Sequence, residues 1–396
     1  MCEKAQAYPP VEYPGVEKAP SGRISPERSR SIPTHPRKVA GIGSEHRPNS
    51  PRNGGRIHVG TVAGLASEWW PDCVGICIFS RNEMRKPKVS IGLPVYNGQL
   101  FIGRALDSII KQNFEDFELI ISDNASKDDT KDICRQYVEK DRRISYYRFE
   151  QNTGAANNYN HVFRLSRGIY FKWAAHDDEC HPAFLRRCVE SLDSAPESVV
   201  MVYPQAELID EEGKTLRTGS DRIESRDIHP HRRLAKILLG MNLCDPVFGL
   251  YKTKYLQKTN LIAPFFGADN VLLAEMAMLG EIRELDEILF RMRAHSLRSM
   301  KANPSARARA VWYDPSAARK LFIMPNWERM VWEMLKAVSR SKLHPADKAK
   351  SFLTVPGVHY WRRFRNAGGL IKNRMKQCIA SMLVEHERDK IAERKP

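Results

Sequence analysis

The chain has 396 residues, 42% of them hydrophobic, and a formal net charge of +16 at pH 7. This length is enough to bury one large hydrophobic core or two ordinary ones. The net charge is +4 over residues 1–85, −4 over residues 86–290 and +16 over residues 291–396. Because the positive charge is confined to the C-terminal quarter and no aromatic-rich RNA-binding motif accompanies it, we do not expect a nucleic-acid-binding protein.

The eight cysteines are scattered and include no CxxC pair, which argues against a zinc site and against a dense disulfide framework. No apolar run reaches the roughly 18–20 residues that span a bilayer, and the N-terminus lacks the apolar region of a signal peptide. We therefore expect a cytoplasmic protein, either soluble or held peripherally at the inner face of the membrane.

Residues 1–84 are expected to form a disordered or poorly ordered N-terminal extension. Residues 1–58 are rich in Pro, Ser, Gly and Arg and poor in large apolar residues, so burial cannot repay the entropy of ordering them. Two interpretations remain open. The natural chain begins at Met84, directly before the first predicted strand, or the extension is a flexible regulatory or linker arm.

Residues 85–300 alternate between strand-like and helix-like segments. The predicted strands are Val89–Leu93, Phe117–Ser122, Ile144–Phe149, Ile169–Ala174 and Val199–Tyr203. The predicted helices are Leu100–Gln112, Thr130–Lys140, Ala155–Ser166 and Ala183–Ser194. A hairpin, Glu207–Leu216, follows, and Val271–Leu279 is a further helix. This alternation predicts an α/β fold with a mostly parallel, Rossmann-like sheet flanked by helices.

Residues 301–396 are expected to form a basic helical C-terminal region, with helical segments at Ala317–Val338 and Tyr360–Glu387. In the second segment apolar residues share one side and Lys and Arg surround them, with an interruption at Gly368-Gly369. Such a helix either lies on an anionic membrane surface or packs on the preceding domain.

Polar side chains follow three of the predicted strands. Pro94-Val95-Tyr96-Asn97 ends the first strand, Asp123 ends the second, and Asp177-Asp178 come shortly after the fourth. Open α/β sheets bind nucleotides at the carboxyl ends of their strands. These residues therefore predict a site for a nucleotide diphosphate that is held through a metal ion.

Five motifs in this order resemble family 2 glycosyltransferases, the large inverting group with the GT-A fold. The matching motifs are Pro94-Val95-Tyr96-Asn97, Ser122-Asp123-Asn124-Ala125-Ser126, Asn152-Thr153-Gly154-Ala155, His176-Asp177-Asp178 and Gly267-Ala268-Asp269. Each motif is weak alone, but their order and spacing over about two hundred residues are specific. The chain departs from the family pattern at Ala175 and Ala268, which stand where an acid is common.

The resemblance implies a nucleotide site formed by Pro94, Val95, Tyr96, Asn97, Asp123, Asn152, Gly154 and Asp177. In the family, the aspartate that matches Asp123 contacts the base. A turn or capping role is the simpler alternative for Asp123, and Gly154 could serve only to form a turn. His161, His176 and Trp173 are weaker candidates for lining a sugar pocket.

The expected cofactor is Mg²⁺ or Mn²⁺, held by Asp177, Asp178 and His295. Hard cations take carboxylate ligands and neutralise the charge of a departing diphosphate. Two adjacent acids also repel each other unless a cation or hydrogen-bond donors compensate. Which of the two aspartates binds the metal stays open, with Asp177 favoured. Arg291 or Arg293 could clamp phosphate oxygens, and a surface histidine is the simpler interpretation of His295.

Asp269 is the candidate general base, because inverting transfer needs one carboxylate that takes the proton of the acceptor hydroxyl. Its position at the start of a helix is equally compatible with a capping role, and the two roles can coexist.

The leading hypothesis is an inverting, metal-dependent glycosyltransferase that moves a sugar from a nucleotide-sugar donor to a glycan or lipid-linked acceptor. The basic C-terminal helices would hold it near membrane-bound acceptors. The alternatives are a nucleotidyltransferase and a non-catalytic protein of the same fold that binds nucleotide-sugar or glycan. All of these hypotheses require Asp123, Asp177 and Asp269 to meet at one edge of the sheet.

Overall fold

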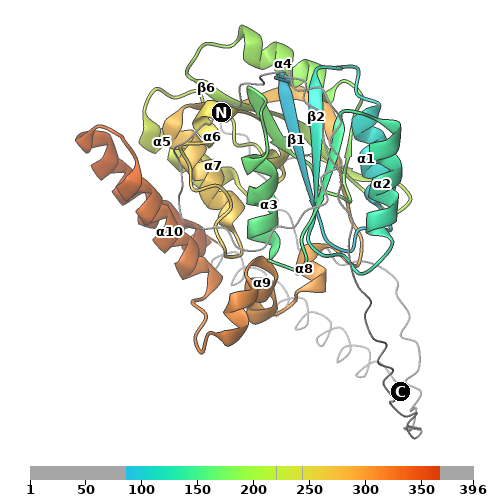
Figure 1. The fold of residues 1–396 in the computed structure, drawn as a ribbon. Coiled ribbons are helices and arrows are strands. Elements are labelled where there is room, and N and C mark those ends of the chain that lie inside the picture. Colours follow the sequence, from blue (N-terminus) through green and yellow to red (C-terminus); the bar gives the residue numbers. More distant parts are fainter. Residues whose placement is uncertain (1–85, 220, 243, 366–396) are drawn as a thin grey trace, which may run out of the picture. The chain divides into compact units, whose positions relative to one another are not determined.

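The computed structural model describes residues 86–365, apart from residues 220 and 243 (Figure 1). The predicted N-terminal extension, residues 1–84, lies outside the described residues. So do residues 366–387 of the predicted last helix, including its interruption at residues 368 and 369.

Four parallel strands form one half of the sheet in the order β3-β2-β1-β4. Their bounds are β1 (Val89–Val95), β2 (Phe117–Asp123), β3 (Ile144–Arg148) and β4 (Tyr170–Trp173). All seven residues of β1 are buried, as expected for a parallel strand covered on both faces. Val95 pairs with Asp123, so β1 and β2 end at the same edge of the sheet.

Three helices connect these strands: α1 (Ile102–Ile110), α2 (Thr130–Lys140) and α3 (Ala155–Arg164). The buried residues of α1 are Ile102, Ala105, Leu106 and Ile109, which share one helical face. Residues of α1 and α2 belong to one hydrophobic cluster and residues of α3 to the other, so both faces of the sheet are covered. The predicted α/β architecture is confirmed, and the bounds of these elements agree with the prediction within two residues.

The other half of the sheet is mixed. In the described residues, the strand order continues from β4 through β8 (Leu250–Lys252), β6 (Val199–Ile209) and β9 (Glu281–Arg293) to β5 (Glu179–Cys180). Only the β6–β9 pair is parallel here. β7 (Thr215–Thr218) forms the predicted hairpin with β6. The pairing of β5 with β9 brings the chain after β4 beside the C-terminal end of β9.

Further helices follow in the second half of the described chain. They are α4 (Phe184–Ser194), α5 (Pro230–Gly240), α6 (Thr253–Leu256), α7 (Ala268–Leu279), α8 (Ser299–Ala302), α9 (Ala306–Tyr313) and α10 (Asn326–Arg340). The 3-10 helices are η1 (Asp245–Phe248) and η2 (Pro315–Arg319), and residues 345–365 are helical as well.

The prediction of one continuous helix over Ala317–Val338 is wrong. η2 ends at Arg319, and α10 begins only at Asn326, after Pro325. Proline disfavours helical backbone in the residue before it, which separates the two helices. The last helix also begins earlier than predicted, at residue 345 instead of residue 360.

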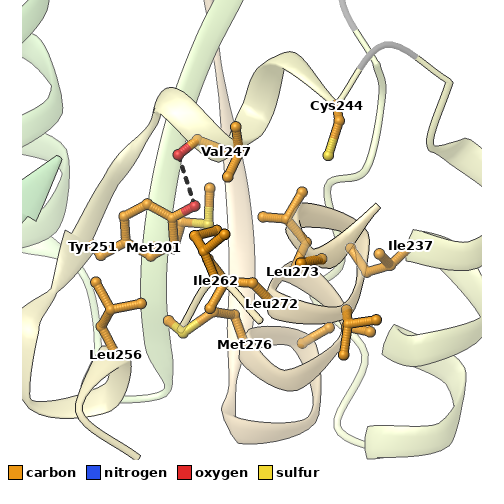
Figure 2. Close-up of a cluster of buried hydrophobic side chains, with 14 of the residues drawn as sticks. Met201, Ile237, Cys244, Val247, Tyr251, Leu256, Ile262, Leu272, Leu273 and Met276 are labelled. Carbon is orange, nitrogen blue, oxygen red and sulfur yellow. Dashed lines mark hydrogen bonds between the residues drawn. The ribbon is translucent and has the colours of Figure 1, made fainter. Parts of the chain in front are cut away.

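The larger hydrophobic cluster lies between the mixed half of the sheet and α7 (Figure 2). It contains Met201 of β6, Tyr251 of β8, and Leu272 and Met276 of α7. The Tyr251 hydroxyl donates a hydrogen bond to the Val247 carbonyl at 2.9 Å. The same cluster includes residues of α9 and α10, namely Tyr313, Met334, Ala337 and Val338. These two C-terminal helices therefore share a core with the sheet.

Within the described part of the chain, no helix combines the length and the apolar character needed to cross a membrane.

Candidate active site

The loop after β1 is held by the loop after β2. Asn97, at a left-handed φ of 50°, donates its backbone N–H to Ser126 Oγ at 2.9 Å. Its side-chain Oδ1 accepts the Lys127 N–H at 2.9 Å, and Gly98 N–H donates to Thr130 Oγ1 at 2.8 Å. These bonds fix the backbone of both loops before any ligand arrives.

The four predicted nucleotide residues of this loop differ in exposure. Pro94 and Val95 are buried, Tyr96 is half-buried and Asn97 is exposed. The Val95 carbonyl accepts the Asn124 N–H at 2.9 Å. Pro94 and Val95 therefore shape the edge, and only Tyr96 and Asn97 present side chains to solvent.

Asp123 lies at the expected end of β2, but its carboxylate is fully buried. Oδ1 accepts the Ser126 N–H at 2.8 Å, and Oδ2 accepts the Tyr146 hydroxyl at 2.6 Å. Arg148 on β3 forms an ion pair with Oδ2 at 3.2 Å. The carboxylate thus stabilises the β2 loop and faces β3, and its contact with a base stays a prediction.

Asn152 and Gly154 are joined to the β2 loop through Asn124. Asn124 Nδ2 donates to Asn152 Oδ1 at 3.0 Å, and Asn124 Oδ1 accepts the Thr153 N–H at 2.8 Å. Gly154 N–H also donates to Asn152 Oδ1 at 2.9 Å. Gly154 adopts φ +89° directly before α3, a conformation that favours glycine. Three predicted loops therefore meet at the carboxyl edge of the parallel strands.

Asp177 and Asp178 lie between β4 and β5 and point in different directions. Asp177 Oδ2 is 2.8 Å from His295 Nε2, whereas Asp178 Oδ1 accepts the Arg293 backbone N–H at 2.8 Å. Burial opposes ionisation of Asp177, but His176 and the hydrogen bond with His295 hold its pKa below the usual range. Burial and the charge of Asp177 raise the pKa of Asp178. Asp177 is therefore the better anionic metal ligand of the two.

His295 is buried, at 5% exposure, and its ring packs against Phe101 with centroids 4.8 Å apart. The structure thus brings His295 to Asp177, as the metal-site prediction requires, and it is not a surface histidine. Its position follows from β9, which ends two residues earlier and pairs with β5 beside the acidic pair.

Arg293 and Arg291 are not available to clamp phosphate oxygens. Arg293 is fully buried and donates to the carbonyls of Asp177, Asp210 and Glu211. Arg291 bonds to the carboxylates of Glu179 and Glu207. Both guanidinium groups hold the β6–β7 hairpin to β9. The prediction that Arg291 or Arg293 clamps phosphate oxygens is therefore wrong.

Asp269 occupies the first turn of α7, after Gly267, whose φ is +94°. Its Oδ1 accepts both the backbone N–H and the side-chain Nδ2 of Asn270, each at 2.9 Å. The Cys244 thiol lies against the same carboxylate. Burial raises the pKa of Asp269 although Asn270 and Cys244 oppose the rise, which brings the carboxylate closer to the range of a general base.

Tyr159 of α3 lies within the electrostatic influence of both predicted acidic groups. Burial raises the pKa of its hydroxyl, and the charges of Asp177, Asp178 and Asp269 raise it further. The fields of the predicted metal ligands and of the predicted base therefore overlap at this phenol.

The three weaker candidates for lining a sugar pocket lie in different environments. Trp173 is fully buried and donates its indole N–H to the Tyr159 carbonyl at 2.9 Å, so it is a core residue and the prediction is wrong. His161 is buried with Nδ1 at 3.0 Å from Ser122 Oγ, beneath the β2 loop. His176 is half-buried against Gly98 and stays a candidate.

Sequence reasoning missed Asn124 as a loop connector, Asn158 and Cys244. Asn158 Nδ2 donates to the carbonyls of Val95 and Ser122 and so joins the ends of β1 and β2. A polar residue on the buried face of a predicted helix was the available signal. Nothing in the sequence connects Cys244 with Asp269, because the two meet only through tertiary packing.

Residues 90–259 match the family model described as glycosyl transferase family 2. An uncharacterized glycosyltransferase of Rickettsia typhi is 34% identical over 136 residues, which are 34% of this chain and 42% of that protein. The GalNAc(5)-diNAcBac-PP-undecaprenol beta-1,3-glucosyltransferase of Campylobacter jejuni is 28% identical over 188 residues, or 47% of this chain and 58% of that protein. The chain thus spans less than two thirds of the length of these relatives.

Among solved structures, S. aureus TarS 1-349 aligns with a TM-score of 0.49 at 17% identity, over 69% of this chain and 72% of that one. Asp269 and His295 both lie beyond the residues that the family model matches.

Proposed function

We propose that the chain, which matches glycosyl transferase family 2 over residues 90–259, transfers a sugar from a nucleotide-sugar donor to an acceptor hydroxyl with inversion. The acceptor would be a glycan or a lipid-linked saccharide. The observation that supports this proposal is that the charges of Asp177, Asp178 and Asp269 all act on the buried hydroxyl of Tyr159. One acidic pair serves a diphosphate held through a cation, and the separate carboxylate serves the acceptor.

The donor nucleotide would bind where the loops after β1, β2 and β3 meet. Tyr96 and Asn97 offer exposed side chains there, and Asn152 and Gly154 form the third loop. Asp123 would contact the base through the acceptor capacity that Oδ1 keeps beside its bond with the Ser126 N–H, or in exchange for the bond of Oδ2 with Tyr146 or Arg148. The connected loops favour a preformed site with little reorganisation on binding.

The proposed divalent cation would be held by two protein side chains, Asp177 and His295, and not by a group of three. Within the described residues, no group of three or more His, Cys, Asp or Glu could hold a metal ion. Asp177 and His295 place a carboxylate oxygen and a ring nitrogen 2.8 Å apart, with Asp178 adjacent. Mg²⁺ typically takes one or two protein carboxylates and completes its shell with phosphate oxygens and water. A bound Mg²⁺ or Mn²⁺ would neutralise the diphosphate charge that develops as the donor bond breaks.

Asp269 would act as the base. Its carboxylate accepts the proton of the acceptor hydroxyl, while the hydroxyl oxygen forms a bond to the anomeric carbon of the donor sugar. The bond from that carbon to the diphosphate breaks on the opposite side, and the nucleoside diphosphate leaves with the electron pair. The raised pKa of Asp269 supports this role, because a base nearer neutral pH takes up the proton more readily.

Thermal stabilisation followed by a transfer assay would test the proposal. UDP-, GDP- and dTDP-sugars are screened with and without Mn²⁺, and one nucleotide class is expected to raise the unfolding temperature only with the cation. The radiolabelled sugar nucleotide of that class should then be hydrolysed, with water as the acceptor of the sugar and nucleoside diphosphate as the leaving group. Asp177→Asn should lose the cation-dependent stabilisation, whereas Asp286→Asn, a matched change at a remote carboxylate that accepts Gln205 Nε2, should retain it.

Three results would contradict the proposal. Release of sugar 1-phosphate instead of nucleoside diphosphate would indicate a nucleotidyltransferase, and stabilisation without sugar release would indicate a non-catalytic binding protein. No stabilisation by any nucleotide would remove the predicted donor site altogether.

A lipid-linked acceptor would agree with the surface of the C-terminal region. Residues 301–365 carry 14 lysines and arginines against four acidic residues. The loop between η2 and α10 exposes Leu321 fully and Phe322 to 74%. Cations beside exposed apolar side chains suit an anionic lipid surface. The protein should sediment with vesicles that contain anionic phospholipid and not with purely zwitterionic vesicles, and Phe322→Ser should weaken this binding. Equal sedimentation with both would contradict it.

A further inference from the structure

The end of α9 contacts the predicted nucleotide loop at its glycine. A Cβ atom on Gly154 would lie 2.5 Å from the Tyr313 carbonyl oxygen and 2.6 Å from Pro315 Cδ. In Figure 1, α9 lies at the lower end of α3, beside the ends of the parallel strands. Only a residue without a side chain allows this approach, so Gly154 and the α9–η2 junction are packed backbone against backbone.

The side chain of the same tyrosine contacts the loop that carries the predicted base. The buried Tyr313 ring meets Phe266 edge-on, with centroids 6.1 Å apart. Its hydroxyl lies beside the Gly267 backbone N–H and within reach of the Asp269 charge. Gly267 caps α7 in a left-handed conformation, and Asp269 follows two residues later. Tyr313 therefore touches both the nucleotide loop and the turn that presents the base.

Local interactions hold α9 and η2 in this place. Ser305 Oγ accepts the Ala308 N–H at 3.0 Å and so caps α9, and Asp314 accepts the Ser316 N–H at the start of η2. Arg309 lies over the Phe266 ring at 5.2 Å. The α9–η2 segment is thus held by capping bonds at the starts of α9 and η2 and by the contact between Arg309 and Phe266.

We propose that Tyr313 is a positioning residue that holds the Gly267–Asp269 turn against Gly154, and that α9–η2 is thereby part of the active site. This proposal rests on the proposed role of Asp269 as the base. The aromatic ring and hydroxyl restrain the turn, and the turn determines where the carboxylate points. A displacement of about 1 Å in such a group can cost up to about a hundredfold in rate.

The groups that face Asp269 determine how its pKa changes when the Gly267–Asp269 turn loosens. They are Asn270 on α7, Cys244 before η1, Tyr159 on α3, Tyr251 on β8 and Tyr313 on α9. The thiol and the phenols keep their protons at neutral pH, because burial and nearby negative charge, Asp269 included, raise their pKa values. Loosening the turn admits water to the carboxylate, which should lower the pKa of Asp269 toward that of an ordinary carboxyl.

Tyr313→Phe tests the proposal, since it removes the hydroxyl and keeps the ring. Tyr137→Phe on α2 is the matched control, because its hydroxyl bonds to Gly103 and Asp107 away from the site. Tyr313→Phe should lower kcat about tenfold at unchanged donor KM and move the acidic limb of kcat to lower pH. Amide hydrogen exchange of residues 265–271 should become faster, and the control should change none of these quantities.

The proposal is overturned if Tyr313→Phe and Tyr137→Phe give the same kcat, acidic limb and exchange rates. Should the wild-type protein transfer no sugar, the proposed function fails, and the exchange of residues 265–271 still decides whether Tyr313 restrains the turn. If Tyr313→Phe does not fold, Phe266→Leu removes the edge-on contact from the other side. It should accelerate the same exchange, and an unchanged rate counts against the proposal.

Discussion

The Asp269 carboxylate is held by its own neighbour and by the end of a distant segment. Asn270 donates two hydrogen bonds to Oδ1, and Cys244 reaches the carboxylate from the chain before η1. This arrangement fixes the direction of the group while burial keeps its pKa raised. The N-cap of α7 is Gly267, so the predicted capping role of Asp269 is wrong, and its carboxylate bonds to Asn270 within the first turn instead.

Replacing Asp269 with Asn should abolish transfer while the donor still binds. The amide keeps the shape of the side chain but cannot take the proton of the acceptor, and general bases contribute about 10²- to 10⁴-fold. Steady-state transfer should fall by about that factor, with unchanged thermal stabilisation by donor and Mn²⁺. Asp286→Asn serves again as the control, and a fall in kcat of less than about tenfold would exclude Asp269 as the base.

Asp245 predicts a pH dependence of stability. Burial, followed by the charge of Asp221, raises its pKa to about 7 although the Asp221 N–H donates to it. Because the folded pKa of Asp245 lies above its unfolded value of 3.8, the folded state favours the protonated carboxyl. The contribution of Asp245 to the free energy of unfolding is therefore complete below pH 3.8 and is lost as pH rises through about 7.

Asp245→Asn removes this loss and keeps an acceptor for the Asp221 N–H. Relative to wild type, the free energy of unfolding of the variant should therefore increase by about 2 kcal/mol between pH 5 and pH 8. Urea unfolding at both pH values measures it. A difference between variant and wild type that does not change with pH would contradict the prediction.

At the scale of elements, α3 is held close to the sheet because β1 has a glycine at the contact. A Cβ on Gly92 would lie 2.5 Å from Val162 Cγ2 and 2.9 Å from Phe171 Cζ. This contact holds α3 against β1, and Gly154 and Tyr159 belong to the first half of the same helix and its N-cap. Strand and helix periodicity predicted both elements, but not how closely they approach.

Gly92→Ala should lower the free energy of unfolding by about 1–3 kcal/mol, because the extra methyl forces α3 away from β1. Gly103→Ala is the matched control, since the added methyl on α1 would meet only Tyr137 Oη, at 3.7 Å. Alanine favours a helix by about 1 kcal/mol over glycine, so the control should be neutral or stabilising. Chemical denaturation compares the two, and equal stabilities would refute the tight packing of α3.

At the scale of the molecule, the C-terminal helices complete the core that supports α7, the helix that carries Asp269. Met334, Ala337 and Val338 of α10 are buried in the same cluster as α7, and Arg340 pairs with Glu275 of α7 at 3.2 Å. The predicted boundary at residue 300 cuts through this cluster.

A chain that ends after residue 300 should therefore lose cooperative unfolding and bind a hydrophobic dye, whereas a chain that ends after residue 365 should not. Removing α9 and α10 exposes the apolar face of α7, and partly packed domains behave in this way. Thermal unfolding followed by near-UV circular dichroism measures the difference. Equal unfolding midpoints for the two chains would show that the helices contribute little to stability.

The sequence by itself determined the parallel half of the sheet and the residues at its carboxyl edge. Short apolar runs and the 3.6-residue helical period are local patterns, so β1 to β4 and α1 to α3 could be read from consecutive residues. Asp123 and Asp177 were found in the same way, from polar residues that follow apolar runs, whereas the role of Asp269 came from the resemblance of its motif to family 2 glycosyltransferases.

Only the tertiary structure decided which side chains face one another. The pairing of β5 with β9 joins Asp177 to His295 and occupies Arg293, and no local pattern reports a contact across more than a hundred residues. Tyr313 likewise approaches Gly154 and Gly267 through packing that depends on the whole core. Local propensity specifies elements, whereas the burial of their combined apolar surfaces determines how they meet.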